Sequence, residues 1–480
     1  MSAVRHSLWA ASSGILMTAS RFAVTAILAR RLATDAFGVY AYSQWLIDIG
    51  FLVCTFGATG VASRYLAEYR HQPDMMVAVL RRWRPFSVAL PFAAALAAGA
   101  GAWVSGMPFD AATHMILLGW GLGSGLWGMH SAALIGLQRF DLIFASNLVA
   151  AGIMLVGALF VPMAASPAPI FAVMAVATVV ASLVGLRAIS QASVGTEAIL
   201  DLSQRRAISL YAVNIWLTAL MWSLVWSRGE IPIIRSLLGD VAVAYYAVAL
   251  TLYGGAVAGV MLAVSGVAPQ VTRCWGEGNE RAAVAICRKV MDLQLLLSGL
   301  GGLALIWLAP ELMQLGFGEQ YRDSALLLGI LALGLPALTV SSHNHLLQIM
   351  TGARYNRNTT LLGVVLLLSL AWLCVSAFGV EGAAWSRAAV LLVLGTITAV
   401  VCWKRWGSAA IGVGNLAGVV LLSVLSVLLH SLPYFEHLLP RLFLLLILSL
   451  TLLAWVRTET KEMVVPHLVR LLWSRLRMSN

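Results

Sequence analysis

Fourteen apolar runs, each long enough to cross a lipid bilayer as a helix, take up most of this 480-residue chain. A hydrocarbon core of about 30 Å needs roughly 20 apolar residues per helix. The composition agrees, because 60% of the residues are hydrophobic, 11% are charged and the mean hydropathy is +0.88. The sequence therefore predicts an all-α, polytopic membrane protein with about 14 transmembrane helices.

The predicted spans are the ranges 8–29, 37–62, 86–106, 114–137, 142–164, 168–186, 208–227, 241–266, 290–309, 324–350, 360–378, 382–403, 411–429 and 438–456.

The positive charges alternate between the two sides of the membrane. Of the 31 Lys and Arg residues, 23 fall in every second gap between apolar runs, 6 fall in the other gaps or in the first turn of a span beside them, and 2, Arg21 and Arg387, lie deeper inside spans. Translocation of Lys and Arg is disfavoured, so we expect cytoplasmic N- and C-termini and a bacterial inner membrane. Loops that face anionic lipid explain the net charge of +11, and no nucleic-acid partner is needed.

Motifs for catalysis and metal binding are absent from the sequence. The five cysteines lie in predicted spans or cytoplasmic gaps, which favours neither a disulfide framework nor a zinc site. The chain has no G-x-x-x-x-G-K-[ST] motif for ATP and no D-x-D triplet for a metal-bound sugar nucleotide. We therefore predict a protein that is not an enzyme and that has no catalytic residue, metal or cofactor.

A short repeat relates the two halves of the chain. The pattern R-x-L-x-x-D-x4-Y begins at Arg30 and again at Arg235, and a second match pairs residues 139–141 with residues 354–356. Both matches occupy equivalent positions, so the halves are predicted to be parallel repeats with a substrate path between them. The predicted domains are an N-terminal lobe with linker (1–206), a C-terminal lobe (207–403), an appended helix pair (404–457) and a cytoplasmic amphipathic tail (458–480).

The chain resembles the polysaccharide (oligosaccharide-lipid) flippase family of the multidrug, oligosaccharidyl-lipid and polysaccharide exporter superfamily. The residues that carry the resemblance are Arg30-Arg31-Leu32, Phe37-Gly38-Val39-Tyr40, Gly60 with Arg64 and Glu68, and Phe317-Gly318 with Tyr321. A proline common before the Phe-Gly-x-Tyr element is absent, and Thr34-Asp35 stands there instead.

The resemblance implies two six-helix bundles that form a V and open alternately to either side. It also implies a flippase that moves a polyprenyl-pyrophosphate-linked oligosaccharide from the cytoplasmic to the periplasmic leaflet. The implied partners are this anionic lipid-linked glycan, membrane lipid and the machinery that polymerises polysaccharide.

Arg21 and Asp48 are predicted to lie near the middle of the membrane, where an ionised group is a functional candidate by default. Arg21 suits a pyrophosphate, because a guanidinium is always charged and donates two parallel hydrogen bonds. Asp48 suits a coupling proton if burial raises its pKa. The alternative for both residues is a structural salt bridge with each other.

Further candidates for substrate binding are Arg387, Asn214, His343, His345 and His130. Arg387 can instead extend to the outer headgroups, and polar residues within spans often bridge helices. The glycine-rich stretch 119–128 and the pair Gly255 and Gly259 are predicted to allow close helix packing or to act as hinges.

Two other functions stay open. A drug or cation antiporter of the same superfamily would favour acidic residues in the cavity, whereas a membrane glycan polymerase or ligase would usually carry a large periplasmic loop. Beyond the first turn of each span, the embedded charges are two Arg and one Asp, which favours an anionic cargo. They do not separate lipid II from O-antigen or exopolysaccharide precursors.

Overall fold

The computed structural model describes residues 3–160, 167–194, 200–265, 267–351, 354–430 and 437–455. Every regular element within these ranges is a helix. The all-α, polytopic membrane fold predicted from the sequence is confirmed. The predicted amphipathic tail, 458–480, lies outside the described residues.

The α-helices are α1 (Ala3–Arg31), α2 (Thr34–Cys54), α3 (Ala58–Glu68), α4 (Pro73–Trp83), α5 (Phe86–Val104), α6 (Ala111–Gly136), α7 (Phe140–Phe160), α8 (Ala168–Leu183), α9 (Leu186–Ala192), α10 (Leu202–Ser223), α11 (Ile231–Leu238), α12 (Asp240–Ser265), α13 (Ala268–Gly276), α14 (Glu280–Trp307), α15 (Ala309–Phe317), α16 (Ala325–Ala332), α17 (Ser341–Thr351), α18 (Arg354–Trp406), α19 (Val413–His430) and α20 (Leu438–Trp455). A π-helix, η1 (Leu224–Arg228), follows α10, and the 3-10 helices are η2 (Glu319–Ser324), η3 (Leu335–Val340) and η4 (Gly407–Ala409).

Eleven helices in the described part of the chain are long and apolar enough to cross a membrane. The predicted count of fourteen is not confirmed by this measure. Part of the difference lies in α18, which contains the two predicted spans 360–378 and 382–403. Gly379 separates them with φ 60° and ψ −145°, a conformation that glycine adopts without the steric penalty of a Cβ atom.

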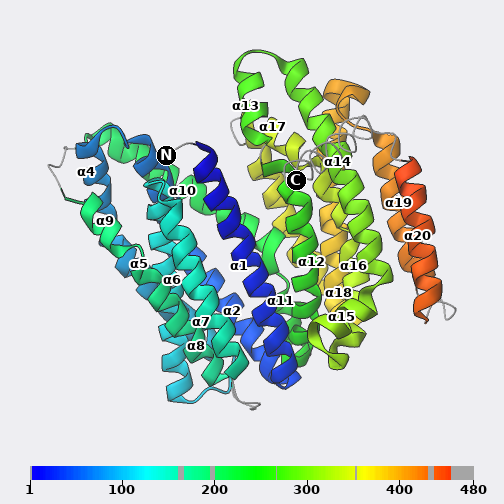
Figure 1. Cartoon of the computed structure of the whole chain (residues 1–480), viewed down its shortest axis with the longest axis horizontal. Helices are drawn as coiled ribbons and strands as arrows, with labels where there is room; N and C mark the ends of the chain where they lie inside the picture. The colour runs from blue at the N-terminus through cyan, green and yellow to red at the C-terminus, as the bar shows by residue number, and fades with distance from the viewer. Residues whose placement is uncertain are drawn as a thin grey trace, which may run out of the picture. The chain divides into compact units, whose positions relative to one another are not determined.

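The chain divides into two compact units, Met1–Ala247 and Val248–Asn480. In the first unit, α6 packs against α5 and α8, while α7 packs against α1 and α8 (Figure 1). In the second unit, α14 is central and contacts α13, α16, α17, α19 and α20. The domain boundaries predicted from the repeat, at 206 and 403, stay predictions.

Glycines bring α6 close to its neighbours. A Cβ atom on Gly121 would lie 3.1 Å from the Cα of Ala95, and one on Gly125 would lie 2.9 Å from the Cα of Pro91. These contacts confirm the close packing predicted for this stretch. Close packing is not found at Gly255 and Gly259 of α12, where no described neighbouring atom lies within 4 Å of such a Cβ, and their role as hinges stays a prediction.

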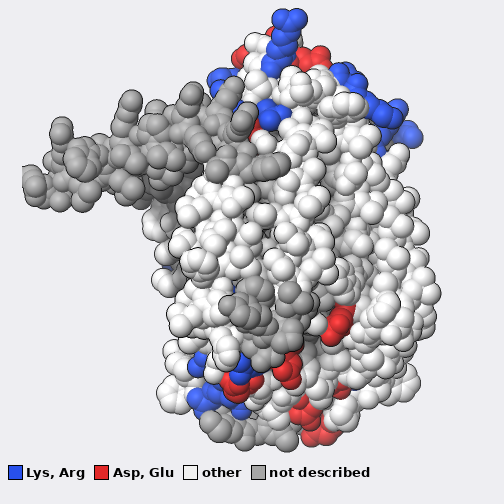
Figure 2. Space-filling view, turned by 90° about the vertical axis from the view of Figure 1, so that its right-hand side faces the viewer, with Lys and Arg blue, Asp and Glu red and all other residues white. Residues whose placement is uncertain are grey.

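One face of the second unit is apolar between two charged ends, as Figure 2 shows. On α19 and α20 the exposed side chains include Leu421, Leu428, Leu439, Phe443 and Leu446. Helices can present such side chains to hydrocarbon because their backbone hydrogen bonds are made internally. This face is therefore suited to contact with lipid tails.

Candidate functional site

Arg21 and Asp48 are both exposed on membrane-spanning helices of the first unit. Arg21 lies on α1, about 15 Å from the end of the helix at Arg31. Asp48 lies on α2, about 9 Å from the end of the helix at Cys54. Both charged groups therefore lie within the length of their helices and not at the helix ends.

The two side chains do not form an ion pair with each other within the described structure. Asp48 Oδ1 instead accepts a hydrogen bond from Gln44 Nε2 at 3.3 Å, one turn earlier on α2. The salt bridge that the sequence left as an alternative is thus not present in this conformation. Both the guanidinium and the carboxylate remain exposed.

Tyr40 is a buried residue on which the charges of both Arg21 and Asp48 act. Its hydroxyl is within electrostatic range of Arg228, Arg21 and Asp48, and its ring stacks on Trp120 with the centroids 5.8 Å apart. Arg228 is one of the six arginines counted on the external side, and its relation to this group was not predicted. Its position directly after the apolar range 208–227 was the available indication, because η1 continues the helix of that span as far as Arg228.

Other predicted binding residues have different surroundings. Asn214 is exposed on α10 in the first unit. His130 is buried, and its Nδ1 lies 2.9 Å from the carbonyl oxygen of Ser182 on α8. His345 Nε2, in the second unit, lies 3.3 Å from Thr272 Oγ1 on α13. The two histidine contacts support the helix-bridging alternative.

Arg387 and His343 are both buried in the second unit. Arg387 on α18 is 2% exposed and His343 on α17 is 0% exposed. Burial of this degree leaves neither side chain open to a substrate in this conformation, nor does it let Arg387 extend to the outer headgroups. Their predicted roles in binding stay predictions.

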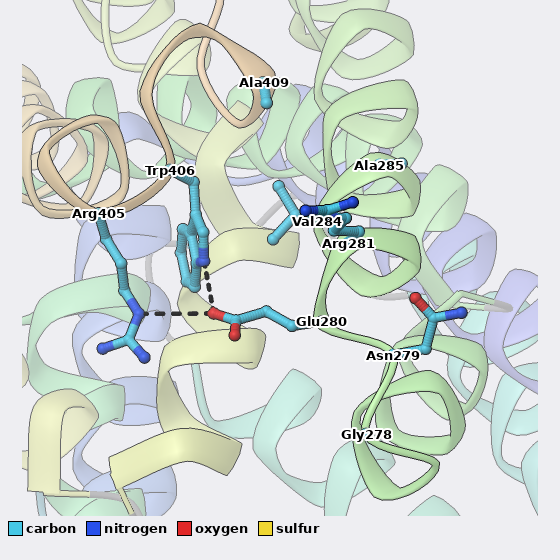
Figure 3. A pocket seen from close by; sticks show the side chains of 9 residues that line it. All are labelled: Gly278, Asn279, Glu280, Arg281, Val284, Ala285, Arg405, Trp406 and Ala409. Carbon is cyan, nitrogen blue, oxygen red and sulfur yellow. Dashed lines mark hydrogen bonds and ion pairs between the residues drawn. The ribbon is translucent and has the colours of Figure 1, made fainter.

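A cavity of about 970 Å³ lies in the second unit, between the start of α14 and the end of α18 (Figure 3). Its lining residues are Gly278, Asn279, Glu280, Arg281, Val284, Ala285, Arg405, Trp406 and Ala409. None of the binding residues predicted from the sequence belongs to this lining.

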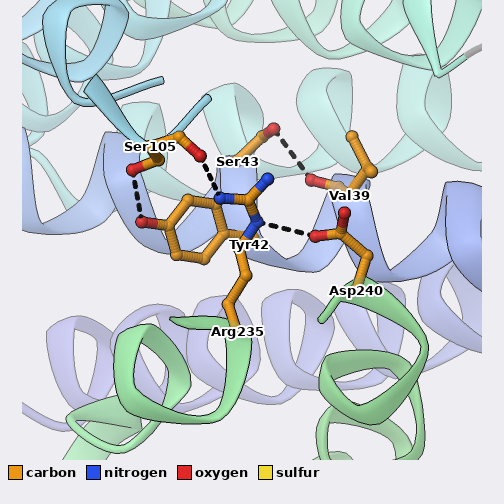
Figure 4. Close-up of polar contacts among 6 residues, drawn as sticks. All are labelled: Val39, Tyr42, Ser43, Ser105, Arg235 and Asp240. Atoms are coloured by element: carbon orange, nitrogen blue, oxygen red, sulfur yellow. Dashed lines mark hydrogen bonds and ion pairs between the residues drawn. The ribbon is translucent and has the colours of Figure 1, made fainter. Parts of the chain in front are cut away.

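The second copy of the repeated R-x-L-x-x-D motif forms a polar cluster that the sequence did not predict (Figure 4). Arg235 Nε donates to Asp240 Oδ1 at 2.7 Å, and its Nη1 donates to the carbonyl oxygen of Ser105, also at 2.7 Å. The guanidinium lies over the ring of Tyr42, 4.5 Å from the centroid. In the first copy, by contrast, Asp35 is exposed.

We expect Arg235→Ala to destabilise the first unit by about 2 kcal/mol, because removal of the guanidinium would leave the carboxylate of Asp240 without its ion-pair partner. The side chain of Arg235 is only 12% exposed. Arg235→Lys should recover only part of the loss, since an ammonium cannot donate to two partners in the same planar geometry. The check is the melting temperature of the purified protein in detergent. An unchanged melting temperature in Arg235→Ala would mean that the cluster adds nothing to stability.

The chain is similar to one known protein family and to several solved structures. Residues 218–373, about a third of the chain, match the MatE family model. The lipid II flippase MurJ in an inward closed conformation matches with a TM-score of 0.66 and 11% identity, covering 96% of this chain and 100% of MurJ. No curated protein sequence matches the chain significantly.

Two transporters of the MOP superfamily also match. An inward-facing multidrug resistance MATE family transporter has a TM-score of 0.65 at 12% identity and covers 82% of this chain and 95% of its own. A transporter from Pyrococcus furiosus, whose binding pocket is described as having reverse polarity, has a TM-score of 0.55 at 13% identity and covers 85% and 95%. These solved structures are described as transporters and a flippase. The chain is thus a multi-pass membrane protein with the fold of the MOP superfamily transporters.

Proposed function

We propose that this protein is a flippase that moves an anionic lipid-linked oligosaccharide from the cytoplasmic to the periplasmic leaflet of a bacterial inner membrane. The observation that carries the proposal is the exposed Arg21 within the length of α1. A guanidinium in contact with lipid tails would cost several kcal/mol, so we expect it to face water in a transport path. There it would bind the pyrophosphate through two parallel hydrogen bonds.

The neighbouring groups fit the same role. Arg228, Arg21 and Asp48 all act electrostatically on the hydroxyl of Tyr40, and two of these three groups are positive. The excess of positive charge favours an anionic cargo. Transport also requires that the cargo or a coupling ion bind the inward-open and outward-open states with different affinity, and Asp48 is the candidate for the ion.

A drug or cation antiporter is the second candidate. The MatE match over residues 218–373 favours it, as does an exposed carboxylate at Asp48 that has no ion-pair partner in the described structure. The polarity of the binding pocket differs even among proteins of this fold, as the Pyrococcus furiosus transporter illustrates. The choice between the two functions therefore depends on whether the positive Arg21 or the negative Asp48 binds the cargo.

Reconstituted liposomes can separate the two functions. We expect the purified protein to move a fluorescent polyprenyl-pyrophosphate oligosaccharide to the outer leaflet, where an enzyme outside the vesicle can reach it. Under an imposed proton or sodium gradient, we expect the protein not to transport a fluorescent drug cation. Vesicles without protein and vesicles with Arg21→Gln are the controls. Movement of the cation without movement of the glycolipid would replace the flippase by the antiporter.

A further inference from the structure

The cavity in the second unit lies beside the ends of two candidate membrane spans. Its walls come from the first turns of α14, which begins at Glu280, and from the last turn of α18, which ends at Trp406. Both helices qualify as membrane spans, so the point where one begins and the other ends lies close to a membrane surface. The charge pattern of the sequence predicts that this surface is cytoplasmic.

The polar part of the cavity has an excess of positive charge. Glu280 is already engaged, because its Oε1 accepts from Trp406 Nε1 at 2.7 Å and lies 3.7 Å from Arg405 Nε (Figure 3). Arg281 is exposed and has no ion-pair partner within the described structure. Its guanidinium is therefore available for an anion. The N-terminus of the 28-residue helix α14 adds a favourable dipole.

The remaining lining is apolar. Val284, Ala285 and Ala409 add small aliphatic surfaces, and Trp406 adds a large ring whose polar edge is held by Glu280. Tryptophan with this orientation is typical of the interface between hydrocarbon and headgroups. A molecule that fits must therefore present both an anion and an apolar part, as a phospholipid does and a free phosphate does not.

We propose that this cavity binds the phosphate of an anionic phospholipid from the same leaflet, with Arg281 as the main phosphate ligand. The glycerol and the first acyl carbons would lie against Val284 and Trp406. Basic pockets between transmembrane helices on the cytoplasmic side recognise anionic headgroups in this way. The site belongs to the second unit, and the proposal does not depend on the cargo assigned to Arg21 in the first unit.

Native mass spectrometry of the full-length protein in detergent tests the proposal, with phosphatidylglycerol and phosphatidylcholine as the two probes. We expect phosphatidylglycerol to be retained preferentially, and Arg281→Gln to weaken its binding about tenfold through loss of a charge-assisted hydrogen bond. The matched control is Arg357→Gln, because Arg357 is exposed in the first turn of α18 and lies outside the cavity. Equal retention of phosphatidylglycerol by Arg281→Gln and by the unchanged protein would overturn the proposal.

A second variant gives a change of the opposite sign, which damage to the fold would not produce. Glu280→Gln keeps an oxygen for Trp406 but removes the negative charge beside Arg405, so we expect tighter binding of phosphatidylglycerol. Competition with glycerol 3-phosphate tests whether the site binds the phosphate of a lipid or a phosphate without acyl chains. We expect glycerol 3-phosphate at equal concentration not to displace phosphatidylglycerol. Displacement by glycerol 3-phosphate, or weaker binding in Glu280→Gln, would contradict a site for the anionic lipid.

Discussion

Arg21→Gln is expected to lower translocation of the lipid-linked oligosaccharide about 10- to 100-fold, with insertion of the protein into the membrane unchanged. A hydrogen bond to a charged group contributes about 1.5–3 kcal/mol, and glutamine keeps the polarity of the site but loses the charge. Arg21→Lys should be intermediate, because an ammonium retains the charge but not the planar pair of donors. The measurement is glycolipid translocation in liposomes that contain matched amounts of protein.

The matched control for this experiment is Arg30→Gln. Arg30 is an exposed arginine of the same helix, nine residues away, and nine residues at 3.6 per turn place it on the opposite face. We expect its translocation rate to stay near that of the unchanged protein. If Arg21→Gln and Arg30→Gln behaved alike, the role assigned to Arg21 would have to be abandoned.

Gly38→Ala is expected to destabilise the protein by about 3 kcal/mol, at the upper end of the range for an overpacked interior. Gly38 lies on α2 where the start of α12 approaches, and a Cβ atom there would overlap the backbone carbonyl group of Asp240. A backbone group cannot rotate away as a side chain can. The two helices would have to separate beside the ion pair of Arg235 and Asp240.

The thermal unfolding midpoint in detergent measures this effect, and Gly152→Ala is the matched control. Gly152 lies within α7, and no atom of the described neighbouring residues lies within 4 Å of a Cβ built there. Alanine favours helix over glycine by about 1 kcal/mol, so the control should unfold at the same or a slightly higher temperature. Similar midpoints for the two variants would show that α2 and α12 are not tightly packed at Gly38.

Much of the fold follows from the sequence because hydropathy is a local property. The apolar ranges 37–62, 142–164 and 290–309 each correspond to a described helix or run of helices, and the interruption between residues 378 and 382 coincides with the left-handed Gly379. Local composition does not predict how closely two helices pack against each other. Gly125 and Gly255 look alike in sequence, yet only Gly125 meets a neighbouring helix closely.

The direction in which a side chain points could not be read from the sequence. Depth along a helix places Arg21 and Asp48 within the membrane, but the helical rotation that exposes both is set by tertiary packing. Burial of Arg387 depends on packing in the same way. The two copies of the repeated motif also differ in a way that the sequence does not reveal, because Arg235 pairs with Asp240 whereas the Asp35 of the first copy is exposed.

The most direct test of the account is whether position 21 meets water inside the membrane. In a variant without the five native cysteines, Arg21→Cys can be exposed to a charged, membrane-impermeant thiol reagent. Ala29→Cys is the buried control, and Leu96→Cys, 50% exposed near the middle of α5, is the control for contact with lipid. The account predicts modification at position 21 alone, with protection by the lipid-linked oligosaccharide; an Arg21→Cys variant as unreactive as Leu96→Cys would contradict it.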